Sequence, residues 1–152
     1  MTQPVASNDD ADLRDVNPAL PKVAAGFTLF AGAVATLNAV QTLLSVRIFS
    51  AWAIVPYVLI AFGVSLVFLA RRVFTARGWA AIGVLVAGSL LVVVSGVWLL
   101  FAVSHGFIAL YALWTPVFAL VAVVMCALSL PACERAARAR SSLAAQGLSI
   151  GI

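Results

Sequence analysis

The stretch LARRVFTARGWA, residues 69–80, places three arginines in the middle of a long apolar region. Between Lys22 and Glu134 the chain has only four charged side chains, and all are arginines. These four are Arg47, Arg71, Arg72 and Arg77. Charged side chains are costly inside hydrocarbon, so arginines mark the points where a chain leaves the membrane. The quoted stretch therefore divides the apolar region in two, and Arg47 divides its first half again.

The composition indicates a membrane protein. Of the 152 residues, 64% are hydrophobic and 9% charged, whereas soluble domains are roughly half apolar and a quarter charged. A soluble fold of this size could not cover so much apolar surface, so part of it must face lipid. The net charge of +4 comes from basic residues beside apolar runs, which favours anionic lipid head groups over nucleic acid as counter-ions.

Four segments are long enough to cross a bilayer, which takes about 20 apolar residues. They are residues 23–46, 48–70, 79–103 and 107–130. The segments are apolar on all sides, and backbone polar groups in lipid must be paired internally, so helices are expected instead of strands. The sequence thus predicts an all-α integral membrane protein with four transmembrane helices in an antiparallel bundle with short loops.

The two ends of the chain differ from this domain. Residues 1–16 are acidic and poor in apolar side chains, which predicts a disordered tail and is unlike a signal peptide. The transmembrane domain is expected over residues 17–130, with Pro131 as its boundary. Residues 131–152 form a basic tail in which apolar residues recur at helical spacing, so a short interfacial helix is expected there.

The basic residues predict the orientation. With four spans both termini lie on one side, and eight basic residues fall on that side against Arg47 alone on the other. The eight are Arg14, Lys22, Arg71, Arg72, Arg77, Arg135, Arg138 and Arg140. Both termini are therefore expected in the cytoplasm, in a multi-pass protein of the inner (plasma) membrane. The bias to Ala, Val and Arg is typical of a bacterial genome rich in G and C.

A polar stripe in the first span is the best candidate for a functional site. Asn38, Gln41, Thr42 and Ser45 follow the i, i+3, i+4, i+7 spacing of one helix face. Thr115 of the fourth span should lie at a similar depth in an antiparallel bundle. One interpretation is a small polar cavity that opens outward. The other is interhelical hydrogen bonding without a cavity, which stabilises membrane bundles by about 0.6 to 2 kcal/mol per bond.

Charged and titratable side chains suggest two further contacts. Arg47 and His105 are candidates for ligand contact on the outer face, although a lone histidine in a turn is also an ordinary polar loop residue. One histidine provides too few ligands for a metal site, so no metal or other cofactor is expected. On the opposite face, basic side chains are expected to contact lipid head groups or an acidic partner. These are Arg71, Arg72, Arg77, Arg135 and Arg138.

Small residues at helical spacing favour close helix packing. Thr28, Gly32 and Thr36 are four residues apart, and a further series in the third span repeats every seven residues. Such series let helix backbones approach closely, either within one chain or between chains.

Patterns typical of enzymes are missing from this sequence, which has no phosphate loop, no paired carboxylates and no nucleophile beside a base. We therefore expect a non-catalytic subunit or assembly factor that acts through helix packing with another membrane protein or with itself. The alternative is a small channel or transporter for a neutral or anionic solute that passes along the polar stripe.

Overall fold

Four helices make up the described part of the chain. The computed structural model describes residues 19–45, 54–104 and 113–145. The helices are α2 (Leu20–Ser45), α3 (Ile54–Phe74), α4 (Gly78–Ser104) and α5 (Trp114–Ala145). Each of them is long and apolar enough to cross a membrane. The predicted helical class and the predicted number of potential spans are confirmed for these residues.

Prolines lie in the first turn of two helices. Pro56 is the third residue of α3, and Pro116 is the third residue of α5. The first backbone N–H groups of a helix have no acceptor within it, so proline, which has no N–H, is tolerated there. Proline thus helps to explain where α3 and α5 begin.

The turn between α3 and α4 is closed by the backbone. Ala76 has a positive φ of 51°, and its N–H bonds the Val73 carbonyl at 2.8 Å. The N–H of Arg77 bonds the Arg72 carbonyl at 3.2 Å. These two bonds are the Schellman arrangement, which ends a helix with a left-handed residue that is usually glycine. Here the left-handed position is occupied by alanine.

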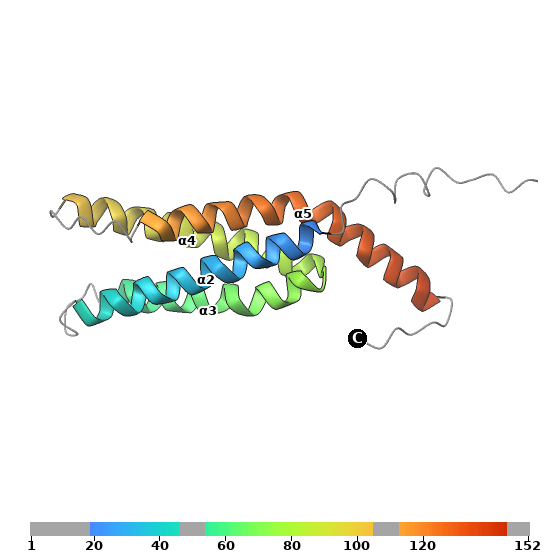
Figure 1. Ribbon diagram of the computed structural model, residues 1–152, viewed down its shortest axis with the longest axis horizontal. Coiled ribbons are helices and arrows are strands. Elements are labelled where there is room, and N and C mark those ends of the chain that lie inside the picture. Colours follow the sequence, from blue (N-terminus) through green and yellow to red (C-terminus); the bar gives the residue numbers. More distant parts are fainter. Residues whose placement is uncertain (1–18, 46–53, 105–112, 146–152) are drawn as a thin grey trace, which may run out of the picture.

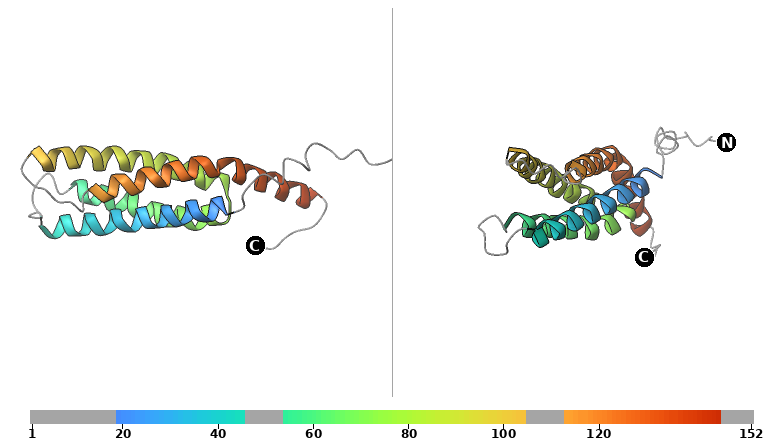
Figure 2. Two further views of the ribbon diagram at one scale, coloured as in Figure 1. Left: turned by 45° about the horizontal axis from the view of Figure 1, so that its top comes forward. Right: turned by 60° about the vertical axis from the view of Figure 1, so that its left-hand side comes forward.

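The helices lie side by side along one long axis (Figure 1). Helix α2 packs against α3 and α5, and α4 packs against the same two helices. Figure 2 shows that α2 and α3 form one pair and α4 and α5 the other. Small buried side chains fill the interior, with a few larger ones such as Leu66, Val84 and Leu91. The outer surface is apolar on every helix, which is unusual for a soluble protein and suits a surface in contact with lipid.

Small residues bring α2 and α3 into close contact. A Cβ atom added at Gly32 would lie 2.6 Å from the carbonyl oxygen of Gly63, and one added at Gly63 would meet the hydroxyl of Thr36. Thr28 turns instead toward α5. In α4, a Cβ atom at Gly88 would lie 2.6 Å from a methyl group of Val123. Gly32, Thr36 and Gly88, which were among the small residues predicted to permit close packing, therefore meet helices of the same chain.

Helix α5 continues through Pro131 to Ala145, so the helix expected after Pro131 is part of α5, while the domain boundary expected at this residue stays a prediction. Proline removes one N–H from the helix ladder and bends a helix without necessarily ending it. Figure 1 shows the last part of α5, drawn in red, projecting beyond the other helices at an angle. Cys133 is buried in this continuous helix.

Candidate functional site

The contact between α2 and α5 contains polar and aromatic side chains at three levels. Near the start of α2, the hydroxyl oxygen of Thr28 lies 3.5 Å from the sulfur of Cys126, and both residues are buried. Near its end, Asn38 Nδ2 donates a hydrogen bond of 2.6 Å to Thr115 Oγ1. An aromatic contact between the two helices lies between these levels.

That aromatic contact is an edge-to-face pair. The ring centroids of Phe30 and Phe118 are 4.7 Å apart, with 75° between the ring planes. Phe118 also stacks on Trp114, with centroids 5.6 Å apart and 23° between the planes. Both geometries are among those that aromatic pairs prefer, and each pair contributes about 0.5 to 1.5 kcal/mol beyond its buried area. The rings keep α2 and α5 apart at this level.

The residues of the predicted polar stripe have different surroundings. Asn38 reaches across to Thr115, which is 3% exposed. Thr42 donates its hydroxyl proton to the backbone carbonyl of Asn38, within its own helix. Gln41 is exposed on the outside of α2, and the side chain of Ser45 lies outside the described part. The structure therefore joins two of the five residues directly, in an interhelical hydrogen bond.

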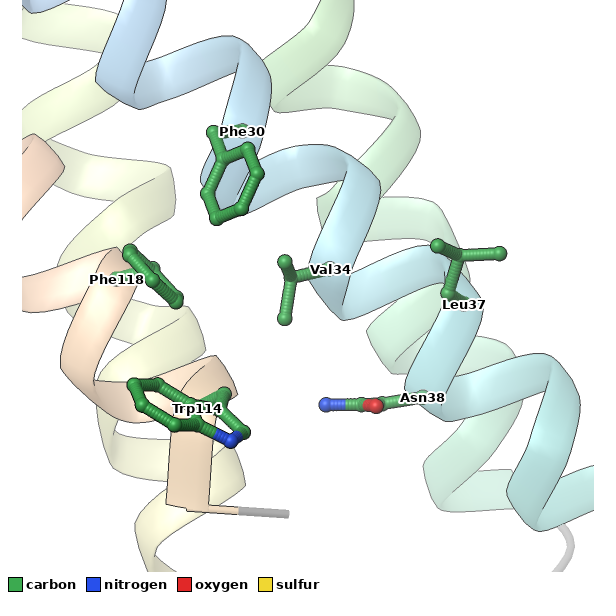
Figure 3. A pocket seen from close by; sticks show the side chains of 6 residues that line it. All are labelled: Phe30, Val34, Leu37, Asn38, Trp114 and Phe118. Atoms are coloured by element: carbon green, nitrogen blue, oxygen red, sulfur yellow. The ribbon is translucent and has the colours of Figure 1, made fainter. Parts of the chain in front are cut away.

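A groove of about 400 Å³ lies between α2 and α5 beside this bond. We call it the α2–α5 groove; its lining residues are Phe30, Val34, Leu37, Asn38, Trp114 and Phe118. Figure 3 shows side chains of α2 directed toward Trp114 and Phe118 of α5, with the Asn38 carboxamide near Trp114 at one end and Phe30 at the other, while Leu37 lies farther from α5. The groove opens on the outside of the bundle, where Leu37 is 69% and Trp114 54% exposed.

The α2–α5 groove has a mostly apolar lining. None of its six lining residues titrates near neutral pH, so they provide no general acid or base. They provide apolar and aromatic surface together with one carboxamide and one indole N–H. Such a lining, mostly apolar with a few polar groups at one end, is typical of sites that bind small apolar ligands.

This groove was hard to predict from the sequence, because its residues are apolar ones within apolar helices. Trp114 and Phe118 are four residues apart, a spacing that allows two rings to stack on one helix face. That spacing was the available signal. Phe30 and Val34 become recognisable only when α5 is placed beside α2.

The basic residues lie at the end of the bundle opposite the Asn38–Thr115 bond. Arg71 and Arg72 are exposed in the last turn of α3, and Arg77 is exposed just before α4. Arg138 is also exposed, and its guanidinium lies 3.8 Å from the carboxylate of Glu134, one turn earlier in α5. Arg135 is partly buried, and Arg140 donates a hydrogen bond to the backbone carbonyl of Thr75. That bond holds the projecting part of α5 against the α3–α4 turn.

Arg47 and His105 lie outside the described residues, so their predicted contact with a ligand stays a prediction. Within the described ranges, no three His, Cys, Asp or Glu side chains gather in a group able to hold a metal ion. Cys126 and Cys133 are both buried and free.

Comparison with known proteins finds no matching family model, no matching curated protein and no matching solved structure. The interpretation of the site therefore rests on its own geometry.

Proposed function

We propose that this chain is a non-catalytic, multi-pass protein of the bacterial inner membrane that acts as a subunit or assembly factor through helix packing. Its partner would be another membrane protein or a second copy of itself. The proposal rests on one observation: a polar side chain of α2 forms a hydrogen bond with another helix of the same chain. The partly buried Asn38 bonds the buried Thr115 between two helices of the bundle, while large apolar side chains are exposed on every helix.

An antiparallel arrangement of the helices is part of the proposal. The first half of α2 contacts the middle of α5 through Thr28 and Cys126. The second half of α2 contacts the first turn of α5 through Asn38 and Thr115. Residue numbers thus rise along α2 as they fall along α5. The short turn after Phe74 supports the same relation between α3 and α4.

The orientation follows from the basic end. Arg71, Arg72 and Arg77 lie at the same end of the bundle as the basic residues of α5, where Arg140 bonds the α3–α4 turn. Basic residues are retained on the cytoplasmic side of membrane proteins. We therefore propose that this end and both termini are cytoplasmic, where the arginines contact anionic lipid head groups.

Photo-crosslinking tests the proposed role. A photoreactive phenylalanine analogue is placed at one exposed position on each helix, namely Leu37, Phe68, Val93 and Leu128. A packing subunit should form one reproducible adduct, with itself or with one protein, from one or two adjacent helices. The matched control is the same analogue in the cytoplasmic tail. A chain that forms no adduct from any helix, and that purifies alone as a monomer in mild detergent, would contradict the proposal.

The alternative, a channel or transporter, requires water along the stripe. Cysteines at positions 38, 41 and 42 should then react with a membrane-impermeant thiol reagent faster than one at Leu37. The exposure of Gln41 and the bond from Thr42 to its own helix favour the packing role. Fast labelling at all three positions would instead favour transport.

A further inference from the structure

The geometry points to the α2–α5 groove as a binding site for one acyl chain of a phospholipid in the outer leaflet, with the ester carbonyl beside Trp114 and Asn38. The inference rests on the membrane placement proposed above. The crosslinking experiment tests the partner separately, so either proposal can fail without the other.

The depth of the groove matches one leaflet. Counted from Trp114, about 20 residues of α5 end at Cys133, directly before the charged Glu134. At 1.5 Å per residue they span about 30 Å, the thickness of the hydrocarbon core. We therefore place the fourth span at about residues 114–133 instead of the residues 107–130 expected from the sequence, with Trp114 at the outer edge of the hydrocarbon, the level that indole rings prefer and where lipid ester groups lie.

The groove ends within the outer leaflet. Along α2 it runs from Asn38 to Phe30, eight residues or about 12 Å. Half of a 30 Å core is about 15 Å. The edge-to-face pair of Phe30 and Phe118 closes the groove at this inner end. A molecule in the groove thus meets hydrogen-bond donors at the membrane surface and aromatic rings near the bilayer centre.

The size of the groove suits a single acyl chain better than a whole transmembrane helix. A helix segment about 12 Å long and about 10 Å across would fill roughly 900 Å³. The groove holds about 400 Å³, a volume in the range of sites for small ligands. A passing helix could insert only side chains, whereas a single chain about 4 to 5 Å wide, as set by carbon–carbon contact distances, can lie along the groove.

The polar end selects an oxygen acceptor. An indole N–H donates hydrogen bonds and cannot accept them. Within the described residues the indole N–H of Trp114 donates no hydrogen bond, and the ring stacks on Phe118. In Figure 3 the indole nitrogen lies on the side of the ring toward Asn38. A lipid ester carbonyl at this level is an acceptor of the required kind.

Native mass spectrometry of the full chain tests the site with dioleoylphosphatidylethanolamine as the probe. This lipid has no net charge, which reduces binding by the arginines at the other end. Val34→Trp should fill the groove and reduce the fraction of chains that retain one lipid at least fivefold. Val93→Trp makes the same substitution on the exposed face of α4, where Val93 is 61% exposed, and should retain lipid like the parent chain.

Trp114→Phe keeps an aromatic ring but removes the N–H. It should reduce retention about three- to fivefold, the effect of one hydrogen bond of about 1 kcal/mol. Equal retention by Val34→Trp and the parent chain would overturn the inference. Two other results would also overturn the inference. One is stoichiometric displacement of the lipid by decylubiquinone, and the other is a dimer of the chain in place of the lipid-bound monomer.

A second measurement does not depend on the folding of Val34→Trp. In a chain with Trp52, Trp79 and Trp98 changed to Phe, Trp114 is the sole tryptophan. Phosphatidylethanolamine brominated in one chain should quench its fluorescence saturably, at about one lipid per protein in detergent. Quenching that rises linearly with the amount of lipid, without saturation, would show that the groove holds no lipid of its own.

Discussion

Helix α2 makes two different contacts on its two sides. Toward α3 it presents Gly32 and Thr36, and the backbones of α2 and α3 come so close at Gly63 that no Cβ atom fits. Toward α5 it presents Phe30 and Asn38, whose longer side chains hold the helices apart and leave the α2–α5 groove. In one helix, side-chain size alone thus decides which side is closed and which side can accept a ligand.

The largest expected effect comes from disrupting the close contact between α2 and α3. Gly32→Val places two methyl groups against the backbone of α3, where a Cβ atom already lies 2.6 Å from the Gly63 oxygen. Overpacking of this kind should lower the free energy of unfolding by about 3 kcal/mol. The measurement is the unfolding equilibrium in mixed micelles. Gly26→Val is the matched control, because a Cβ atom at Gly26 meets nothing within 4 Å; an equal loss in both variants would contradict this account.

On the open side, Phe118→Ala should have a smaller effect. It removes the edge contact with Phe30 and the stack on Trp114, which together contribute about 1 to 3 kcal/mol. We expect a loss of about 2 kcal/mol in the same unfolding assay. Val117→Ala, on the exposed face of α5, should change stability by less than about 0.5 kcal/mol. Similar losses in the two variants would show that the aromatic contact does not support the α2–α5 pair.

The hydrogen bond between Asn38 and Thr115 should contribute less again. In a double-mutant cycle with Asn38→Leu and Thr115→Val, we expect a coupling energy of about 1 kcal/mol, within the range for hydrogen bonds between membrane helices. Gln41→Leu, one turn along α2 and exposed, should show no coupling to Thr115→Val. A coupling energy of zero for the first pair would mean that this bond does not hold α5 to α2.

A change remote from both contacts has the smallest expected effect and the opposite sign. Ala76 has a left-handed conformation in the α3–α4 turn, which disfavours every residue with a Cβ atom relative to glycine. Ala76→Gly should therefore stabilise the chain by up to about 1 kcal/mol. The thermal midpoint in detergent is the measurement, and Thr75→Gly, next in the chain, should not raise it.

Much of the fold could be predicted because it depends on composition along the chain. The positions of Arg71, Arg72 and Arg77 correctly predicted the break between α3 and α4, because charged side chains are costly in hydrocarbon. Pro131 does not end α5, because a proline removes one hydrogen bond and the remaining bonds are enough to continue the helix. The spacing of Asn38 and Thr115 from their helix ends was sufficient to predict that they lie at similar depth, and the structure joins them.

The candidate site was less accessible to prediction. Gln41 and Thr42 share a stripe with Asn38, yet one is exposed and the other bonds its own backbone. Helical spacing states which residues share a face, but a face about 100° wide includes side chains that a neighbouring helix does not reach. The groove itself is lined by five apolar residues and one asparagine, and apolar residues are the common background of this sequence.

Four apolar helices and the break marked by Arg71, Arg72 and Arg77 could be predicted from the sequence, because the energies of charge and of backbone polar groups in hydrocarbon depend on the local sequence alone. Which side of α2 is closed and which is open depends on how the helices pack. That outcome depends on the residue opposite each position: Gly63 opposite Gly32 allows contact, and Phe118 opposite Phe30 prevents it.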